Sequence, residues 1–371
     1  MADKGKSSAP SNRGRTAVQW QRNSVIDAAN AGVLKDVRIT QDQLVTLHRL
    51  HRRFMNRQEN GRRVRLTRCD LRGLVLRDMD FTEAEFVQCN FAGADLSHAT
   101  FHNATLLSSV LDQATMTFTD FNGADLRGVR FEDSVIEVAQ FDNADLRPGG
   151  VMARDSQAMV EQVRSRFRGA TLRGTDLSRA KLQAADFRHA ELCDSNLAAS
   201  DLRGADFRGA NLIGANLSQA SIVDADFRGA ALADARIDNL NFDFAHSGEV
   251  KPLTDAELRS RLERHRAWAE SEGKSAAPVV LQGVDLTGRD LSGMNMAAMD
   301  LRETVLVECD LRGTVLAAAK LQDANLARAD LTGADLRGTD FTGANLRDAD
   351  LTDTVQGRLA DTGLETVFAD T

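Results

Sequence analysis

The sequence lacks several features that would place it in a common class of protein. It holds no tyrosine, 4 prolines and 4 cysteines in 371 residues, and only 5% of the residues are aromatic. No apolar run approaches the roughly 18 residues that a membrane helix needs. The basic N-terminal stretch is not followed by the apolar segment of a secretory signal peptide. We therefore expect a cytoplasmic protein with no membrane span.

The cysteines and histidines also lack the spacing of a metal or redox site. Cys69, Cys89, Cys193 and Cys309 form no CxxC pair, and the seven histidines form no HExxH or comparable motif. No Ser/His/Asp order, glycine-rich phosphate loop or pair of carboxylates stands out. The sequence thus predicts unpaired thiols, no metal site, no cofactor site and no catalytic residue. We expect the protein not to be an enzyme.

An apolar residue recurs at every fifth position in three long runs. The first run covers residues 66–146, the second 166–242 and the third 281–355. A small residue such as Ala84 or Ala205 stands two places before each apolar residue. A period of five fits neither a helix nor a strand, so one small and one large residue must face inward in each unit. Such units cannot bury their apolar pair alone, and a stacked solenoid of about 48 repeats is expected.

Phenylalanines recur at a second period of twenty residues, which corresponds to four repeats. Four repeats per coil predict a four-sided solenoid with about 12 coils. Stacked coils would place the phenylalanines in core columns, about 4.8 Å apart. The sequence leaves open whether the three runs share one axis or form separate rods. The column members are Phe81, Phe101, Phe121 and Phe141 in the first run, and Phe167, Phe187, Phe207 and Phe227 in the second.

The repeat unit resembles the A(D/N)LXX unit of the pentapeptide-repeat family. Examples are the five residues from Ala205 to Gly209 (ADFRG) and from Ala329 to Gly333 (ADLTG). The resemblance covers about two-thirds of the chain. It implies an all-β solenoid, a right-handed quadrilateral β-helix with Leu or Phe at the central inward position. Four inward positions depart from the small-residue pattern, which predicts widened or terminal coils there: Leu74, Met79, Arg289 and Met294.

The N-terminal segment does not follow the period of five. Residues 1–16 are expected to be a flexible basic tail, and residues 17–65 a helical cap with helices over 17–31 and 40–57. Thr40 and Gln43 have the spacing of a capping box at the start of the second helix. Helices at the open end of a solenoid would cover its unpaired strand edges.

Two further segments interrupt the runs, and one follows them. Residues 147–165 contain the turn signal Pro-Gly-Gly and predict a short helix over 156–165. Residues 243–280 are expected to be a helical insertion, with a capping box at Thr254 and Glu257 and a helix toward Ser271. Residues 356–371 are expected to form a C-terminal cap or tail.

The helical insertion duplicates the N-terminal cap. His51 and Phe54 match His265 and Trp268 at the same offset of 214 residues. Two interpretations stay open for these histidines. They are either functional, or buried beside an aromatic ring in a cap.

Charge is distributed unevenly along the chain. Residues 1–65 carry a net charge of +9, whereas residues 66–146, 166–245 and 281–355 carry −9, −1 and −6. Arg52, Arg53 and Arg57 belong to a basic cluster near the end of the predicted cap helix, which makes them candidate contact residues. Direct nucleic-acid binding is not expected, since no nucleic-acid-binding fold is recognisable. Docking of the basic head onto the acidic first coils is an equally economical prediction.

An arginine follows each of the four phenylalanines of the second run. Asp186, Asp206 and Asp226 stand just before three of the same phenylalanines. Stacked coils would place the two kinds of residue in neighbouring outer columns, which predicts a ladder of salt bridges. The alternative is a stripe that binds an anion or a protein partner. The arginine column consists of Arg168, Arg188, Arg208 and Arg228.

These features favour a noncatalytic protein-interaction scaffold or adaptor that binds another protein. The alternative is an acidic DNA mimic that binds a DNA-handling enzyme such as gyrase, which the resemblance to gyrase-protecting members of the family implies. A homodimer through the C-terminal segment also stays open.

Overall fold

The computed structural model describes most of the chain. The predicted helix over 17–31, the tail before it and the residues after 358 lie outside the described residues, as does Thr254 of the second capping box. The described residues are 33–152, 159–237, 240, 245, 255–271 and 278–358.

Parallel bridges between residues twenty apart hold the coils together. Asp80 pairs with Thr100, and Thr100 pairs with Asp120. Most sides of a coil form only one isolated bridge to the next coil, which is too short to count as a strand. Few strands are therefore named. They are β1 (Val33–Lys35), β2 (Arg65–Thr67) and β3 (Glu85–Val87), which pair in parallel in that order.

Strand β1 adds a solenoid strand that the sequence does not predict. It lies within the segment expected to be a helical cap. Leu34 is in register with Leu66, as Leu66 is with Phe86, so its buried side chain extends the core by one layer. The repeat pattern misses this strand because α2 (Gln41–Met55) separates it from the first run.

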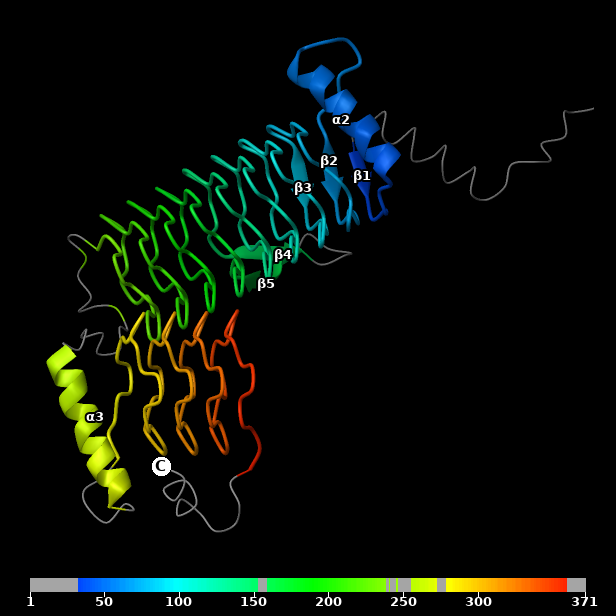
Figure 1. Ribbon diagram of the computed structural model, residues 1–371. Coiled ribbons are helices and arrows are strands. Elements are labelled where there is room, and N and C mark those ends of the chain that lie inside the picture. The colour runs from blue at the N-terminus through cyan, green and yellow to red at the C-terminus, as the bar shows by residue number, and fades with distance from the viewer. Residues whose placement is uncertain are drawn as a thin grey trace, which may run out of the picture.

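The first and second runs form one continuous rod, here called the long rod (Figure 1). Arg130 bridges to Arg166 and Val135 to Thr171, so the coils continue across the break in the period. The intervening residues leave the rod as an antiparallel hairpin of β4 (Gly149–Met152) and β5 (Met159–Val163). The helix predicted over 156–165 is therefore wrong for residues 159–163. Pairing with β4 satisfies the backbone there, and short apolar patterns do not distinguish the two structures.

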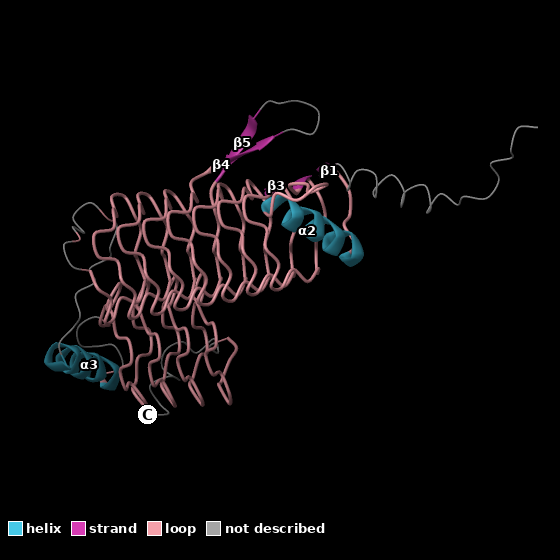
Figure 2. Ribbon diagram, turned by 90° about the horizontal axis from the view of Figure 1, so that it is seen from above, coloured by secondary structure: helices cyan, strands magenta, loops and turns pink. Residues whose placement is uncertain are grey.

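The third run forms a second, short rod that lies beside the second run (Figures 1 and 2). Its own bridges run from Val280 with Asp300 to Asp335 with Val355. The chain advances along the short rod in the direction opposite to its course along the long rod. The third run therefore does not share the axis of the first two.

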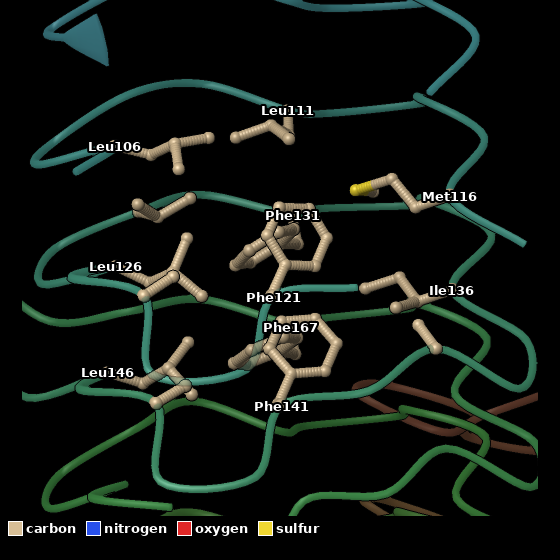
Figure 3. Packing of buried hydrophobic residues seen from close by; sticks show 14 of the residues in the cluster. Leu106, Leu111, Met116, Phe121, Leu126, Phe131, Ile136, Phe141, Leu146 and Phe167 are labelled. Carbon is tan, nitrogen blue, oxygen red and sulfur yellow. The ribbon is translucent and has the colours of Figure 1, made fainter. Parts of the chain in front are cut away.

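The predicted phenylalanine columns are present, on different sides of the long rod. Phe101, Phe121 and Phe141 stack with ring centroids 5.3 and 4.9 Å apart. Phe167 stacks on Phe131 at 4.7 Å and not on Phe141, because the hairpin shifts the phase of the second run. Figure 3 shows these rings between leucines on one side and Met116 and Ile136 on the other. All eight phenylalanines of the predicted columns are fully buried.

The helices lie at rod ends. α2 begins with the predicted capping box of Thr40 and Gln43, and the Gln41 side chain donates to the Val75 carbonyl at 2.7 Å. α3 (Asp255–Glu270) lies at the start of the short rod (Figure 1). Neither described helix is long and apolar enough to cross a membrane. The oversized inward residues lie in the first coils of the two rods, which are terminal, as the sequence predicts: Leu74 and Met79 in the long rod, Arg289 and Met294 in the short rod.

Candidate interaction surface

The two rods meet along a seam in which side-chain amides bind turn carbonyls. Asn345 donates to the Gly209 carbonyl at 3.1 Å, and Asn325 donates to that of Gly229 at 3.3 Å. Arg347 donates to the Gly169 carbonyl at 2.7 Å. Small turn residues let the short rod approach the backbone of the long rod closely enough for these contacts.

The centre of the seam combines apolar and ionic contacts. Glu191 is buried, accepts from Asn211 at 3.1 Å and lies 3.6 Å from Arg328 of the short rod. Arg328 also pairs with Glu308 at 2.8 Å. Paired charges of this kind fix the register of one rod on the other. A small apolar cluster lies beside them: Ile213, Ala231, Val305, Val307 and Ala327.

The arginine column forms the predicted ladder of salt bridges. Arg188 binds Asp186 at 2.6 Å, and Arg208 binds Asp206 at 2.7 Å. Between coils, the Arg188 Nε lies 3.6 Å from Asp206. Arg188, Arg208 and Arg228 each stand two positions after an aspartate, whereas Arg168 follows Arg166, so the coil places a carboxylate beside three of the four guanidinium groups. The like charges of these three arginines are thereby compensated.

The pKa values in the column reflect this pairing. Burial acts to raise the pKa of Asp186, but hydrogen bonds from the side chain and backbone of Arg188 outweigh it, and the pKa lies below its usual value. The hydrogen bond to Asp206 raises the pKa of Arg208. Both groups stay charged near neutral pH.

The arginine column borders a groove at the seam and is not a free outer face. The four arginines line a hollow of about 190 Å³ together with His189, Gly209 and, from the short rod, Glu303 and Asp323. The side chains of Arg188, Arg208 and Arg228 remain 34%, 43% and 42% exposed. The groove thus presents partly exposed arginines beside acidic groups.

The basic head contacts the first coils through two arginines. Arg63 pairs with Glu85 at 3.1 Å, and Arg65 lies 3.5 Å from the same carboxylate. Arg52, Arg53 and Arg57 are exposed and form no salt bridge with a described carboxylate. The structure therefore does not bring these three together with the arginine column.

His51 and His265 are buried in the caps, as one of the two interpretations predicts. His51 stacks between Phe54 and Phe81, and its Nδ1 accepts from the Val64 amide at 3.2 Å. His265 contacts Trp268, and its Nδ1 accepts from the Val279 amide at 3.3 Å. Burial lowers the pKa of both rings. Each neutral histidine fixes the chain where it enters the first repeat.

The described residues offer little for metal or thiol chemistry. No group of three His, Cys, Asp or Glu side chains within them could hold a metal ion. All four cysteines are buried free thiols, and burial raises the pKa of Cys193 and Cys309.

The sequence pattern does not identify the residues of the short rod that line the groove and the seam. Asn325 and Asn345 stand twenty residues apart, which is a detectable signal. Asn and Asp are ordinary at that position of the repeat, however, so the signal does not separate seam residues from others. Glu303 and Asp323 are missed for the same reason.

Two family models match the chain. One, described as pentapeptide repeats, matches with eight copies over residues 163–198, 200–239, 280–317 and 319–355. The other, described as a pentapeptide repeat region, matches residues 62–147. No curated protein matches the chain.

Solved structures of repeat proteins are also similar to the chain. HetL of the cyanobacterium Nostoc sp. strain PCC 7120, involved in heterocyst differentiation regulation, is 20% identical over 86% of this chain and 97% of its own, with a TM-score of 0.28. QnrB1, a plasmid-mediated fluoroquinolone resistance protein, is 15% identical over 56% and 91%, with a TM-score of 0.29. Rfr23 of the cyanobacterium Cyanothece 51142 is 24% identical over 31% and 80%, with a TM-score of 0.21.

Proposed function

The chain belongs to the pentapeptide-repeat family, and from that premise we propose that it is a noncatalytic scaffold that binds another protein at the groove along the seam. The groove between the rods carries this proposal. Its four arginines are repeated at the spacing of the coils, and three of them, Arg188, Arg208 and Arg228, are partly exposed and held in place by aspartates. A rigid row of this kind suits the acidic or polar surface of a partner protein.

The packing of the rods supports a surface function. The inward phenylalanines of the second run are fully buried, and their stacked rings, with centroids 4.7 to 4.9 Å apart, fill the interior of the rod. A filled interior offers no deep pocket for a substrate. Contact area is available on the flat outer faces.

The DNA-mimic alternative has weaker support. It requires a row of uncompensated carboxylates. Arg72 pairs with Asp70, Arg127 with Asp125, and Arg147 with Asp145, all at 2.6 to 2.7 Å. Arginines therefore interrupt the row of carboxylates at these positions of the first run.

A pull-down from a lysate of the source organism tests the proposal. The change of the four column arginines to Gln should abolish capture of the partner seen with the unchanged chain. The matched control changes Arg127, Arg147, Arg203 and Arg312 to Gln, since these arginines make the same pair with an aspartate elsewhere. Equal loss in both variants, or no loss in the first, would contradict the proposal.

A further inference from the structure

The face of the long rod that carries the short rod continues over the first run, where among the described residues Gln41 of α2 contacts it at Val75 and the short rod does not reach it. Thr171 lies at the seam, where Arg347 contacts it. Parallel bridges connect Thr171 to Val135 and lead back through the first run to Val75. The short rod ends near Gly169 and does not extend over these coils (Figures 1 and 2). Val75 and Val135 are 49% and 37% exposed.

Bulky side chains occupy a strained corner beside this face. His98, Phe118 and Val138 have φ angles of 59°, 58° and 56°. The left-handed region favours Gly and Asn and is a genuine outlier for a β-branched residue. Phe118 is 52% exposed and Val138 41%, and the Phe118 ring stacks on His98 at 5.1 Å. Turn residues throughout the rods share this left-handed conformation, so what distinguishes this column is its exposed apolar side chains, which mark a contact surface.

The columns of this face are self-complementary when a second copy is turned end for end. A two-fold axis lying across the face places the first member of each column opposite the fourth, and the second opposite the third. One column consists of Arg77, Ser97, Thr117 and Glu137, one from each of four successive coils. In it, Arg77 of one copy faces Glu137 of the other, and Ser97 faces Thr117. Glu137 has no ion-pair partner among the described residues.

The two neighbouring columns give the same result, except at the ends of the corner column. In the column of bridging residues, Val75 meets Val135, and the Asp95 carboxylate meets the Thr115 hydroxyl. In the corner column, His98 of one copy meets Phe118 of the other, as these rings already stack within one chain. The outer members of the corner column do not match, because Asp78 meets Val138. The complementarity therefore rests on the column of Arg77, the column of bridging residues and the central pair of the corner column.

Charge favours the same arrangement at its ends. The N-terminal cap of each copy would approach the short rod of the other. Residues 33–65 hold nine basic and three acidic residues, whereas residues 281–355 hold seven and thirteen. Opposite net charges attract across such a contact.

We propose that the first-run face forms the contact of an antiparallel homodimer. A second copy is the occupant because the face continues an established rod-on-rod interface and is complementary to itself. The contact is isologous and closed, since each copy offers the same face. The proposal is independent of the partner groove, which lies at the seam.

Sedimentation equilibrium of the full chain tests the dimer, and variants that reverse the charge at Glu137 or Arg77 test the proposed contact specifically. Glu137→Arg should weaken the dimer at least tenfold, because the introduced guanidinium would face Arg77 of the other copy. Arg77→Glu should weaken it too, although Arg77 also binds Asp95 at 2.7 Å within its own chain. The double variant should recover to within about threefold of the unchanged chain.

A second probe relieves backbone strain at the corner, which should stabilise the fold of each chain while it weakens the dimer. Phe118→Asn should raise the Tm, since Asn tolerates the left-handed region, while weakening the dimer at least tenfold through loss of the contact with His98. Ala199→Gly is the matched control: Ala199 is exposed at another corner with a φ of 56°, so its change should raise the Tm and leave the dimer intact. Val223→Asn, at a 44% exposed valine, should leave the dimer intact.

Several results would overturn the proposal. They are a monomer at every concentration, a double charge variant no better than its singles, or a dimer that survives Phe118→Asn. A dimer lost only when residues 359–371 are removed would place the contact at the C-terminus and also overturn it.

Discussion

Asn345 donates its side-chain amide to the carbonyl of Gly209 at 3.1 Å, across the seam between the rods and 136 residues away in the chain. The same amide donates to Asn325 Oδ1 at 3.1 Å. Both asparagines are buried, so their bonds are shielded from water. This pair fixes how the short rod sits on the long rod, and hence the shape of the groove.

Asn345→Asp should release the short rod from the long rod. A carboxylate would face the Gly209 carbonyl with no proton to donate, at a cost of about 1 to 3 kcal/mol. Small-angle scattering should show a larger radius of gyration. Asn295→Asp is the control, because Asn295 belongs to the same rod and bonds only to the Ala297 amide among the described contacts. Unchanged scattering by the Asn345 variant would count against the role of the seam.

Phe187→Ala should strongly destabilise the long rod. The ring stacks on Phe167 at 4.7 Å and on Phe207 at 4.9 Å, and truncation leaves a cavity in a filled column. The free energy of unfolding should fall by about 3 to 5 kcal/mol in urea titrations. Val223→Ala, at an exposed site, should change it by less than about 0.5 kcal/mol. Similar losses in both variants would show that the column is not the source of stability.

Gly209→Ala should cost more than Gly204→Ala. Both glycines have φ angles near 65°, so both substitutions introduce left-handed strain of about 1 kcal/mol. A Cβ at Gly209 would also lie 2.7 Å from His189 Nδ1, whereas a Cβ at Gly204 meets no atom within 4 Å. Thermal unfolding of the two variants measures the difference. Equal Tm values would argue against close packing at the groove.

Mild acid should loosen the caps. Nδ1 of His51 accepts a hydrogen bond and cannot do so when protonated, and burial lowers its pKa from the usual 6.5, with Asp80 and Glu83 acting against that shift and Arg63 with it. The stabilisation is complete above pH 6.5. As the pH falls below 6.5, the unfolded chain binds a proton that the folded cap excludes, so stability declines until the lower folded pKa is passed.

Hydrogen exchange of residues 40–65 measures this effect. After correction for intrinsic rates, amides there should be less protected at pH 5.5 than at pH 7.5. The His51→Gln variant should lose this difference. Equal protection at both pH values in the unchanged chain would refute the role of His51.

The period of five predicts the coils, the inward residues and the phenylalanine columns, because every coil must bury the same pair of side chains. It does not predict the two rods. The seam depends on single residues such as Asn325 and Asn345, and asparagine also occupies this position in coils that face solvent. Strand β1 and the β4–β5 hairpin escape prediction for a related reason: each is too short for its period to emerge.

The arginine column illustrates the same limit within the candidate site. The Asp-Phe-Arg order predicts the salt bridge between Asp206 and Arg208, since both belong to one repeat. The groove requires Glu303 and Asp323 from a rod almost a hundred residues further along the chain. Local sequence contains no information about that juxtaposition.

We propose that a partner protein binds the groove at the seam. Hydrogen exchange of the chain, alone and in complex with the protein captured from the source lysate, tests it most directly. We expect protection concentrated around Arg188, Arg208, Glu303 and Asp323, and no displacement of the partner by duplex DNA. Protection confined to the acidic coils of the first run, with release of the partner by DNA, would contradict it and establish mimicry instead.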